Sequence, residues 1–270
     1  MSFGSIPKLP VSLPSIAGQN VYTIPDGERR LLQFEDIDLW VQPDLGNVKR
    51  VGSKLIAAGR KGYTASTDAS TITVGTGMEN GIATINIPGG TLSDKLPLSV
   101  KDYRIVGSYF AAILFRWDAA VSLSGAAYQL FNCGVEGGDD VELYMLNNAL
   151  YLRHGDAQNA TSGTRFAANT SYLVWASYDA NSDTAEYGIN SASPETWTSE
   201  LLTGSPNCQR DLVIGGKFNP AGTGGAQLLH GQVRGFWAGP VNWATSDKAA
   251  IREAFISEIA ALYPDDITLD

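Results

Sequence analysis

Two carboxylates in one short segment, Asp140 and Glu142, are the residues best placed to do chemistry. Alternate residues of a strand point to the same face, so these side chains would lie about 6.6 Å apart. Pairs of carboxylates at similar separations cleave glycosidic bonds. An acidic strand start exposed to solvent explains the same two residues, and this is the favoured interpretation.

Oxygen-bearing side chains also alternate at Asp179, Asn181 and Asp183, as at the start of a calcium-binding loop. Thr184 stands where such a loop needs glycine, and no glutamate follows at the twelfth position. A hairpin turn built from Asp and Asn accounts for the pattern and is favoured. We therefore expect no metal site and no cofactor, although these three residues stay candidates for ligand binding.

Trp197 lies in a polar segment, residues 193–199, where an exposed ring could stack on a sugar or anchor another protein. Sugar stacking, protein contact and simple packing are equally open for it. His154 and His230 are predicted to be structural, because no nucleophile motif accompanies them. Cys133 and Cys208 are predicted to be buried thiols, with a disulfide left open.

The composition indicates a folded, acidic protein. Of 270 residues, 44% are hydrophobic and 17% charged, and the net charge of −9 would repel nucleic acid and anionic membranes. No apolar run reaches the length of about 18 residues that a membrane helix needs, and the N-terminus lacks the pattern of a signal peptide. We expect synthesis in a cytoplasm and no insertion into a membrane.

Most of the chain alternates as strands do. The clearest strand is predicted at 103–117, and tight hairpins at 141–154 and 172–190, the first turning at two asparagines. Further strands are expected at 64–74, 81–87, 211–218 and 228–237, and a helix from 245 or 246 to 262. Its predicted apolar face comprises Ile251, Phe255, Ile259 and Leu262. The fold class is therefore all-β, a two-sheet antiparallel sandwich with one C-terminal helix.

The order of these elements over residues 65–263, ending in a strand with two glycines, a long loop, a strand and a helix, resembles concanavalin A-like, laminin G-like jelly-roll domains. The resemblance implies that strand 81–87 pairs beside the closing strand. Retaining glucanases of this general fold carry Glu, Asp and Glu at alternate positions of one strand. Here these positions are Gly138, Asp140 and Glu142, so the nucleophile is missing and we predict a protein that is not an enzyme.

Residues 1–60 are predicted to form an extended N-terminal arm, because Pro7, Pro10, Pro14 and Pro25 exclude helix. Residues 29–41 within it alternate partly, as a strand does. The arm keeps apolar residues that would anchor it to its own domain or to a neighbouring subunit, namely Ile6, Leu9, Val11, Leu13 and Ile16. Residues 61–263 would form the sandwich and 264–270 a tail.

The predicted function is that of a structural protein of a virion, as a capsid decoration or a part of a tail. Residues 24–33 resemble bacteriophage appendage proteins. The expected partners are other virion proteins and copies of the chain itself, as a homo-oligomer and by analogy a trimer, with synthesis in the host cytoplasm. The alternative is a lectin or adhesin that binds host glycans, assisted by calcium; a more remote one is a glycoside hydrolase.

Overall fold

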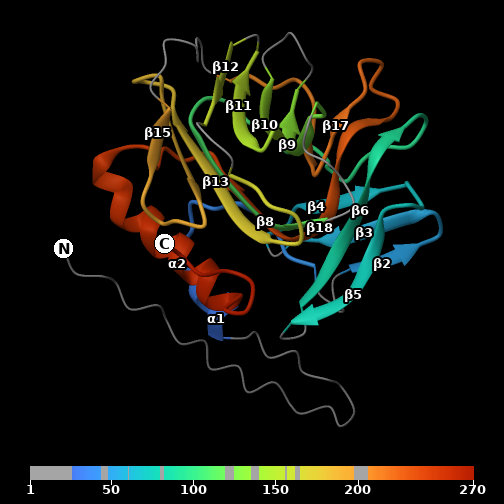
Figure 1. Cartoon of the computed structure of the whole chain (residues 1–270), viewed down its shortest axis with the longest axis horizontal. Coiled ribbons are helices and arrows are strands. Elements are labelled where there is room, and N and C mark those ends of the chain that lie inside the picture. Colours follow the sequence, from blue (N-terminus) through green and yellow to red (C-terminus); the bar gives the residue numbers. More distant parts are fainter. Residues whose placement is uncertain are drawn as a thin grey trace.

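The computed structural model describes residues 26–43, 48–59, 61–79, 82–118, 125–134, 140–155, 157–161, 165–197 and 206–270. Over these residues the chain forms two antiparallel sheets of nine strands each, packed face to face, with a C-terminal helix against one of them (Figure 1). The prediction of an all-β sandwich with one C-terminal helix is confirmed.

The first sheet, here called sheet A, is ordered β15 (Glu195–Trp197), β14 (Thr184–Ile189), β13 (Ser171–Asp179), β8 (Tyr109–Trp117), β18 (Gly225–Gly239), β6 (Ile82–Leu92) and β5 (Thr73–Glu79), with β1 (Leu39–Val41) and β17 (Lys217–Phe218) also paired to β18. The second, sheet B, is ordered β12 (Ala157–Ala160), β11 (Ala149–His154), β10 (Val141–Leu146), β9 (Tyr128–Cys133), β16 (Leu212–Ile214), β7 (Ser99–Val100), β4 (Thr64–Thr67), β3 (Lys54–Ala58) and β2 (Val48–Val51).

Strand β8 shows how both faces of sheet A are used. Its residues Ile113 and Phe115 belong to the core between the two sheets, whereas Phe110 and Leu114 belong to a second core with the helices. The predicted strand began at 103, but β8 begins only at Tyr109, because Gly107 has a φ of +70° and turns the chain. A strand with apolar residues on both faces needs a layer on each side.

The predicted hairpins are confirmed. Strands β10 and β11 pair across Asn147 and Asn148, whose φ values are +51° and +63°, as a tight two-residue turn requires. Strands β13 and β14 pair in the second hairpin. The opening strand β6 lies beside the closing strand β18, as the resemblance implied.

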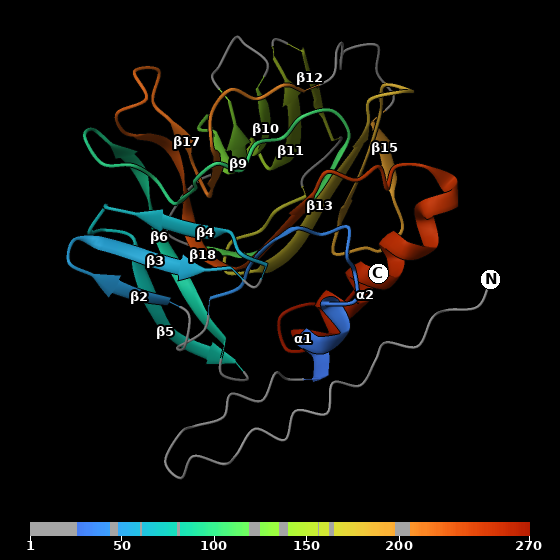
Figure 2. The same cartoon turned by 180° about the vertical axis from the view of Figure 1, so that it is seen from behind.

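The helix α2 (Ala249–Leu262), after a 3₁₀ turn at Ser246–Lys248, packs with α1 (Asp26–Leu31) on the outer face of sheet A (Figure 2). Its predicted apolar face is confirmed at Phe255 and Ile259, which are buried, but is wrong at Ile251, which is 39% exposed, and Arg252 is buried although it was not predicted to be. The guanidinium of Arg252 pairs with Glu186, donates to the Trp243 carbonyl at 2.6 Å and lies 5.0 Å from the Trp175 ring. These partners compensate the buried charge, which is why an arginine can occupy the packed face.

The boundary predicted at residue 60 is wrong for residues 26–43 and 48–58, which contribute α1, β1, β2 and β3 to the structure. In β1, Trp40 is paired with Trp237 of β18 and is buried. The partial alternation of residues 29–41 therefore reflects a short helix and a short strand. The five predicted anchor residues, Ile6 to Ile16, lie outside the described residues, and the arm stays a prediction for them. No helix in the described ranges is long and apolar enough to span a membrane.

Candidate functional site

Four polar side chains lie in one row across four neighbouring strands of sheet A. Arg116 of β8 is the register partner of Gln232 in β18, Gln232 is the partner of Asn86 in β6, and Asn86 is the partner of Thr73 in β5. Arg116 lies on the same outer face of β8 as Phe110. The helix α2 covers this face at Phe110, whereas Arg116 is exposed. The row is therefore a direct product of strand register.

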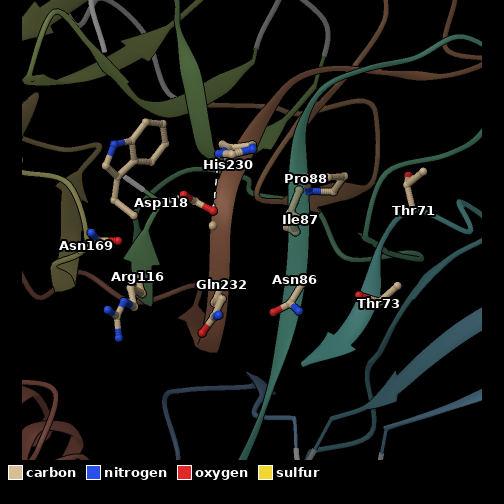
Figure 3. Close-up of a pocket in the computed structure, with 12 residues that line it drawn as sticks. Thr71, Thr73, Asn86, Ile87, Pro88, Arg116, Asp118, Asn169, His230 and Gln232 are labelled. Carbon is tan, nitrogen blue, oxygen red and sulfur yellow. Dashed lines mark ion pairs between the residues drawn. The ribbon is translucent and has the colours of Figure 1, made fainter. Parts of the chain in front are cut away.

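A second row of residues lies two positions further along the same strands. His230 pairs with Pro88 across β18 and β6, and the Asp118 amide donates to the His230 carbonyl at 3.0 Å. His230 Nδ1 lies 3.9 Å from Asp118 Oδ2 (Figure 3). With Thr71, Asn169 and the first row, these residues line a cavity of about 620 Å³, here called the sheet A hollow.

Two glycines allow the strands that line the sheet A hollow to approach one another closely. A Cβ on Gly231 would lie 2.1 Å from the Arg116 carbonyl oxygen, which real Cβ atoms do not tolerate. Gly89 has a φ of +79°, and a Cβ there would lie 2.7 Å from Cδ2 of His230. Glycine at both positions therefore lets the backbones of β8, β18 and β6 approach and lets the histidine ring lie over β6.

The sheet A hollow offers a dense mixture of donors and acceptors. Arg116 supplies N–H donors, Asp118 supplies carboxylate acceptors, and Gln232 and Asn86 supply an amide with both functions each. Trp117 is buried below them, so the imidazole of His230 is the ring that a ligand would meet. Such a lining suits a ligand with several hydroxyl groups and a negative charge.

The structure places Asp140 and Glu142 in a buried polar cluster and not on a solvated strand start. Their exposed fractions are 0% and 1%, and Arg153 Nη2 lies 3.0 Å from Asp140 Oδ2 and 2.7 Å from Glu142 Oε1. The favoured interpretation of an exposed acidic pair is therefore wrong. The reason is the neighbouring strand β11, which brings the guanidinium between the two carboxylates.

Further donors complete this cluster around Glu142. Gln129 Nε2 donates to Glu142 Oε2 at 2.9 Å, Asn132 Nδ2 donates to Oε1 at 3.4 Å, and Lys217 Nζ lies 3.4 Å from Oε1. Burial raises the pKa of Asp140 to about 7, against the opposing effect of Arg153, and the charge of Glu142 raises it further. Asp140 thus takes up a proton near neutral pH, while Glu142 keeps several partners.

The predicted ligand residues of the 179–183 segment form a hairpin turn. Asp179 Oδ1 accepts from the Asn181 amide at 2.9 Å and Oδ2 from the Ser182 hydroxyl at 2.6 Å. Asp183 has a φ of +53°, and its Oδ1 accepts from the Tyr178 hydroxyl at 2.8 Å. In the described ranges no group of three or more His, Cys, Asp or Glu is placed to hold a metal ion.

Trp197 lies in the core and not on the surface. It is 5% exposed, and its ring centroid lies 4.0 Å from that of Tyr187 on the neighbouring strand. Of the three interpretations left open for this residue, the structure favours packing. The ring has no face available to a sugar.

The two histidines have different surroundings. His154 is buried, shares a hydrogen bond with the Tyr109 hydroxyl at 2.9 Å, and burial lowers its pKa to about 3, so it is structural as predicted. His230 lines the sheet A hollow, which the sequence did not indicate. Cys133 and Cys208 are free and buried, and the Cys208 thiol donates to the Cys133 carbonyl at 2.9 Å.

No known protein family and no curated protein matches the sequence. Solved structures do match the fold. The ligand-binding domain of botulinum neurotoxin serotype D in complex with N-acetylneuraminic acid has a TM-score of 0.55 and 10% identity, over 87% of this chain and 52% of that chain. Trypanosoma rangeli sialidase in complex with sialic acid has a TM-score of 0.51 and 13% identity, over 83% and 33%.

A carbohydrate-binding module of the CBM40 type from the Ruminococcus gnavus IT-sialidase, bound to α2,3-sialyllactose, has a TM-score of 0.46 and 15% identity, over 63% of this chain and 95% of that chain. At such identities the likeness of the first two structures shows the fold alone, a two-sheet β-sandwich.

Proposed function

We propose that the chain is a glycan-binding module that holds its sugar in the sheet A hollow and does not cleave it. The observation that carries this proposal is the row of Arg116, Gln232, Asn86 and Thr73 across four strands. Their side chains lie on one rigid surface, and they can serve several hydroxyl groups of one ligand at once.

The neighbours of this fold support a glycan as the ligand class. The neurotoxin domain and the Trypanosoma sialidase are solved with sialic acid, an acidic sugar. In this chain Arg116 is the exposed cation of the sheet A hollow, and a guanidinium binds a carboxylate through two parallel hydrogen bonds. Sialylated glycans are therefore the first ligands to test.

Hydrolysis is not proposed. The carboxylates Asp140 and Glu142 are buried among Arg153, Lys217 and two amides, and neither belongs to the described lining of the sheet A hollow or of the smaller cavity beside β9 and β17. The sheet A hollow contains one carboxylate, Asp118, among the described residues that line it. A pair of carboxylates flanking the bond is what glycosidases require.

The experiment is a glycan array probed with the purified chain, in which each sialylated glycan is paired with its asialo form. Binding of one set that is lost in the Arg116→Gln variant supports the proposal. Uniform silence of the array, or binding that survives in that variant, contradicts it. The predicted calcium assistance is tested by repeating the array with EDTA.

The virion role remains a prediction from the sequence, since none of the described residues bears on it. Its test is a mass-spectrometric search for this chain in purified virus particles. Absence of the chain from the particles would remove that role and leave the glycan-binding proposal unaffected.

A further inference from the structure

A second cavity, of about 340 Å³, lies beside β9 and β17 and shares no lining residue with the sheet A hollow. It is here called the β9–β17 cavity. Its volume falls in the range of small-molecule sites. It lies next to the buried polar cluster, since Asn132 and Lys217 belong to both. The side chains that define it are Asn132, Arg210, Lys217, Phe218 and Asn219.

Two residues that line the β9–β17 cavity each carry a buried polar atom that has no partner among the described residues. Asn132 is 1% exposed, and no donor among the described residues reaches its Oδ1, although its Nδ2 donates to Glu142. Arg210 Nη1 is likewise without an acceptor in the described part of the chain. Buried polar groups are normally hydrogen-bonded, so these two unpaired atoms, both on residues that line the cavity, indicate a missing partner.

Charge favours an anion at this position. Arg210 and Lys217 line the cavity, and Arg153 belongs to the neighbouring polar cluster. The described acidic groups of that cluster are the two carboxylates Asp140 and Glu142. These three cations outnumber the two carboxylates, so the named groups have a net positive charge even when both carboxylates are ionised, and protonation of Asp140 makes the charge more positive.

An apolar wall completes the β9–β17 cavity. The Arg210 guanidinium lies 5.8 Å from the centroid of the Phe218 ring, which is partly exposed. Gly134 also lines it with a φ of +111°, and a Cβ there would lie 2.7 Å from the Cα of Asp140. The backbone at Gly134 therefore lies against the polar cluster. The Phe218 ring offers a surface on which the C–H face of a ligand can pack.

We propose that the β9–β17 cavity is a second ligand site that takes a small hydroxylated carboxylate, namely an acidic sugar of the uronic acid class. Its carboxylate accepts hydrogen bonds from Arg210 and Lys217, a hydroxyl group donates to Asn132 Oδ1, and its carbon skeleton packs on Phe218. The proposal is independent of the glycan proposed for the sheet A hollow, because the two sites have no residue in common.

The experiment is isothermal titration calorimetry of the full chain with D-glucuronate, and with D-glucose and acetate as controls for the charge and the hydroxyl groups. We expect saturable binding of glucuronate and at least about tenfold weaker binding of glucose and of acetate. The Arg210→Gln variant should weaken glucuronate binding by about tenfold or more. Arg210 is partly exposed, so this variant is expected to fold, which circular dichroism verifies.

Two further variants separate this site from the sheet A hollow. Arg104→Gln removes an exposed charge elsewhere and should leave glucuronate binding unchanged, and so should Arg116→Gln. Amide NMR signals of Gly134 and Lys217 should shift on titration, while that of Gly231 should not. No binding of glucuronate, equal binding of acetate or glucose, full binding in Arg210→Gln, or shifts confined to Gly231 would each overturn the second site and leave the glycan proposal to its own test.

Discussion

Arg153 Nη2 lies 3.0 Å from Asp140 Oδ2, and this contact ties β11 to the start of β10 within a buried surface. The arginine favours the charged form of the carboxyl group, but burial outweighs it and raises the pKa of Asp140. The two residues therefore form an ion pair mainly above about pH 7, where Asp140 is ionised, and a hydrogen bond to a neutral acid below it.

Asp140→Asn should make stability less dependent on pH. Between its ordinary pKa of 3.8 and the folded value of about 7, Asp140 holds a proton in the folded chain that the unfolded chain has released. Its contribution to stability is therefore complete below about pH 4 and is lost as the pH rises to about 7. In urea unfolding between about pH 4 and 7, the free energy of unfolding should fall less with rising pH in the variant than in the wild type. The exposed Asp265→Asn is the control, and identical slopes in all three proteins would contradict the assignment.

Arg116→Gln should weaken the binding of any glycan that the array identifies by about tenfold or more, because a charge-assisted hydrogen bond becomes a neutral one. The melting temperature should stay unchanged, since this side chain is exposed. Calorimetry with the identified glycan measures the effect. Arg104→Gln, which removes the same charge from an exposed position outside the sheet A hollow, should bind as the wild type does.

The helix α2 offers a comparison of a buried and an exposed ion pair. Arg252→Ala should lower the free energy of unfolding by about 3 kcal/mol, because Glu186 loses its cation and Trp243 and Trp175 lose a packed neighbour. Arg30→Ala removes the exposed partner of Glu258 and should lower it by less than about 1 kcal/mol. Chemical denaturation measures both, and equal effects would contradict the burial of Arg252.

Trp197→Ala should lower the free energy of unfolding by about 3 kcal/mol, since it removes a buried ring packed on Tyr187. Glycan binding by the folded protein should be unchanged. A variant that kept wild-type stability but lost its glycan would instead restore the sugar-stacking interpretation. Trp197→Phe, which keeps a ring at this place, should show a smaller loss of stability.

EDTA and added calcium should leave the melting temperature and glycan binding unchanged. Burial disfavours the charged form of Asp179, but hydrogen bonds from Ser182 and Asn181 outweigh it and lower its pKa, so its oxygens already have donors. Asp183 likewise accepts from Tyr178. Scanning calorimetry checks this expectation, and a rise of the melting temperature with calcium would show that the 179–183 turn binds the ion.

The sequence by itself determined the features that depend on neighbours in the chain. The turn at Asn147 and Asn148 was predictable because tolerance of positive φ belongs to the residue type. The helix after residue 245 was predictable from its polar start, and so was the burial of Phe255 and Ile259, but the burial of Arg252 was not. Arg252 is buried only because Glu186 and Trp243, on distant segments, receive its charge.

Only the tertiary structure decided where the candidate sites lie. Arg116, Gln232, Asn86 and Thr73 are each unremarkable polar residues of a strand, and their row exists because β8, β18, β6 and β5 pair in one register. A bulge between Val233 and Gly235 shifts that register within β18, and a local pattern does not reveal it. Burial is decided in the same way. The sequence favoured an exposed Asp140 and left Trp197 open between exposure and packing, and both residues are buried in the folded chain because burial depends on contacts between distant segments.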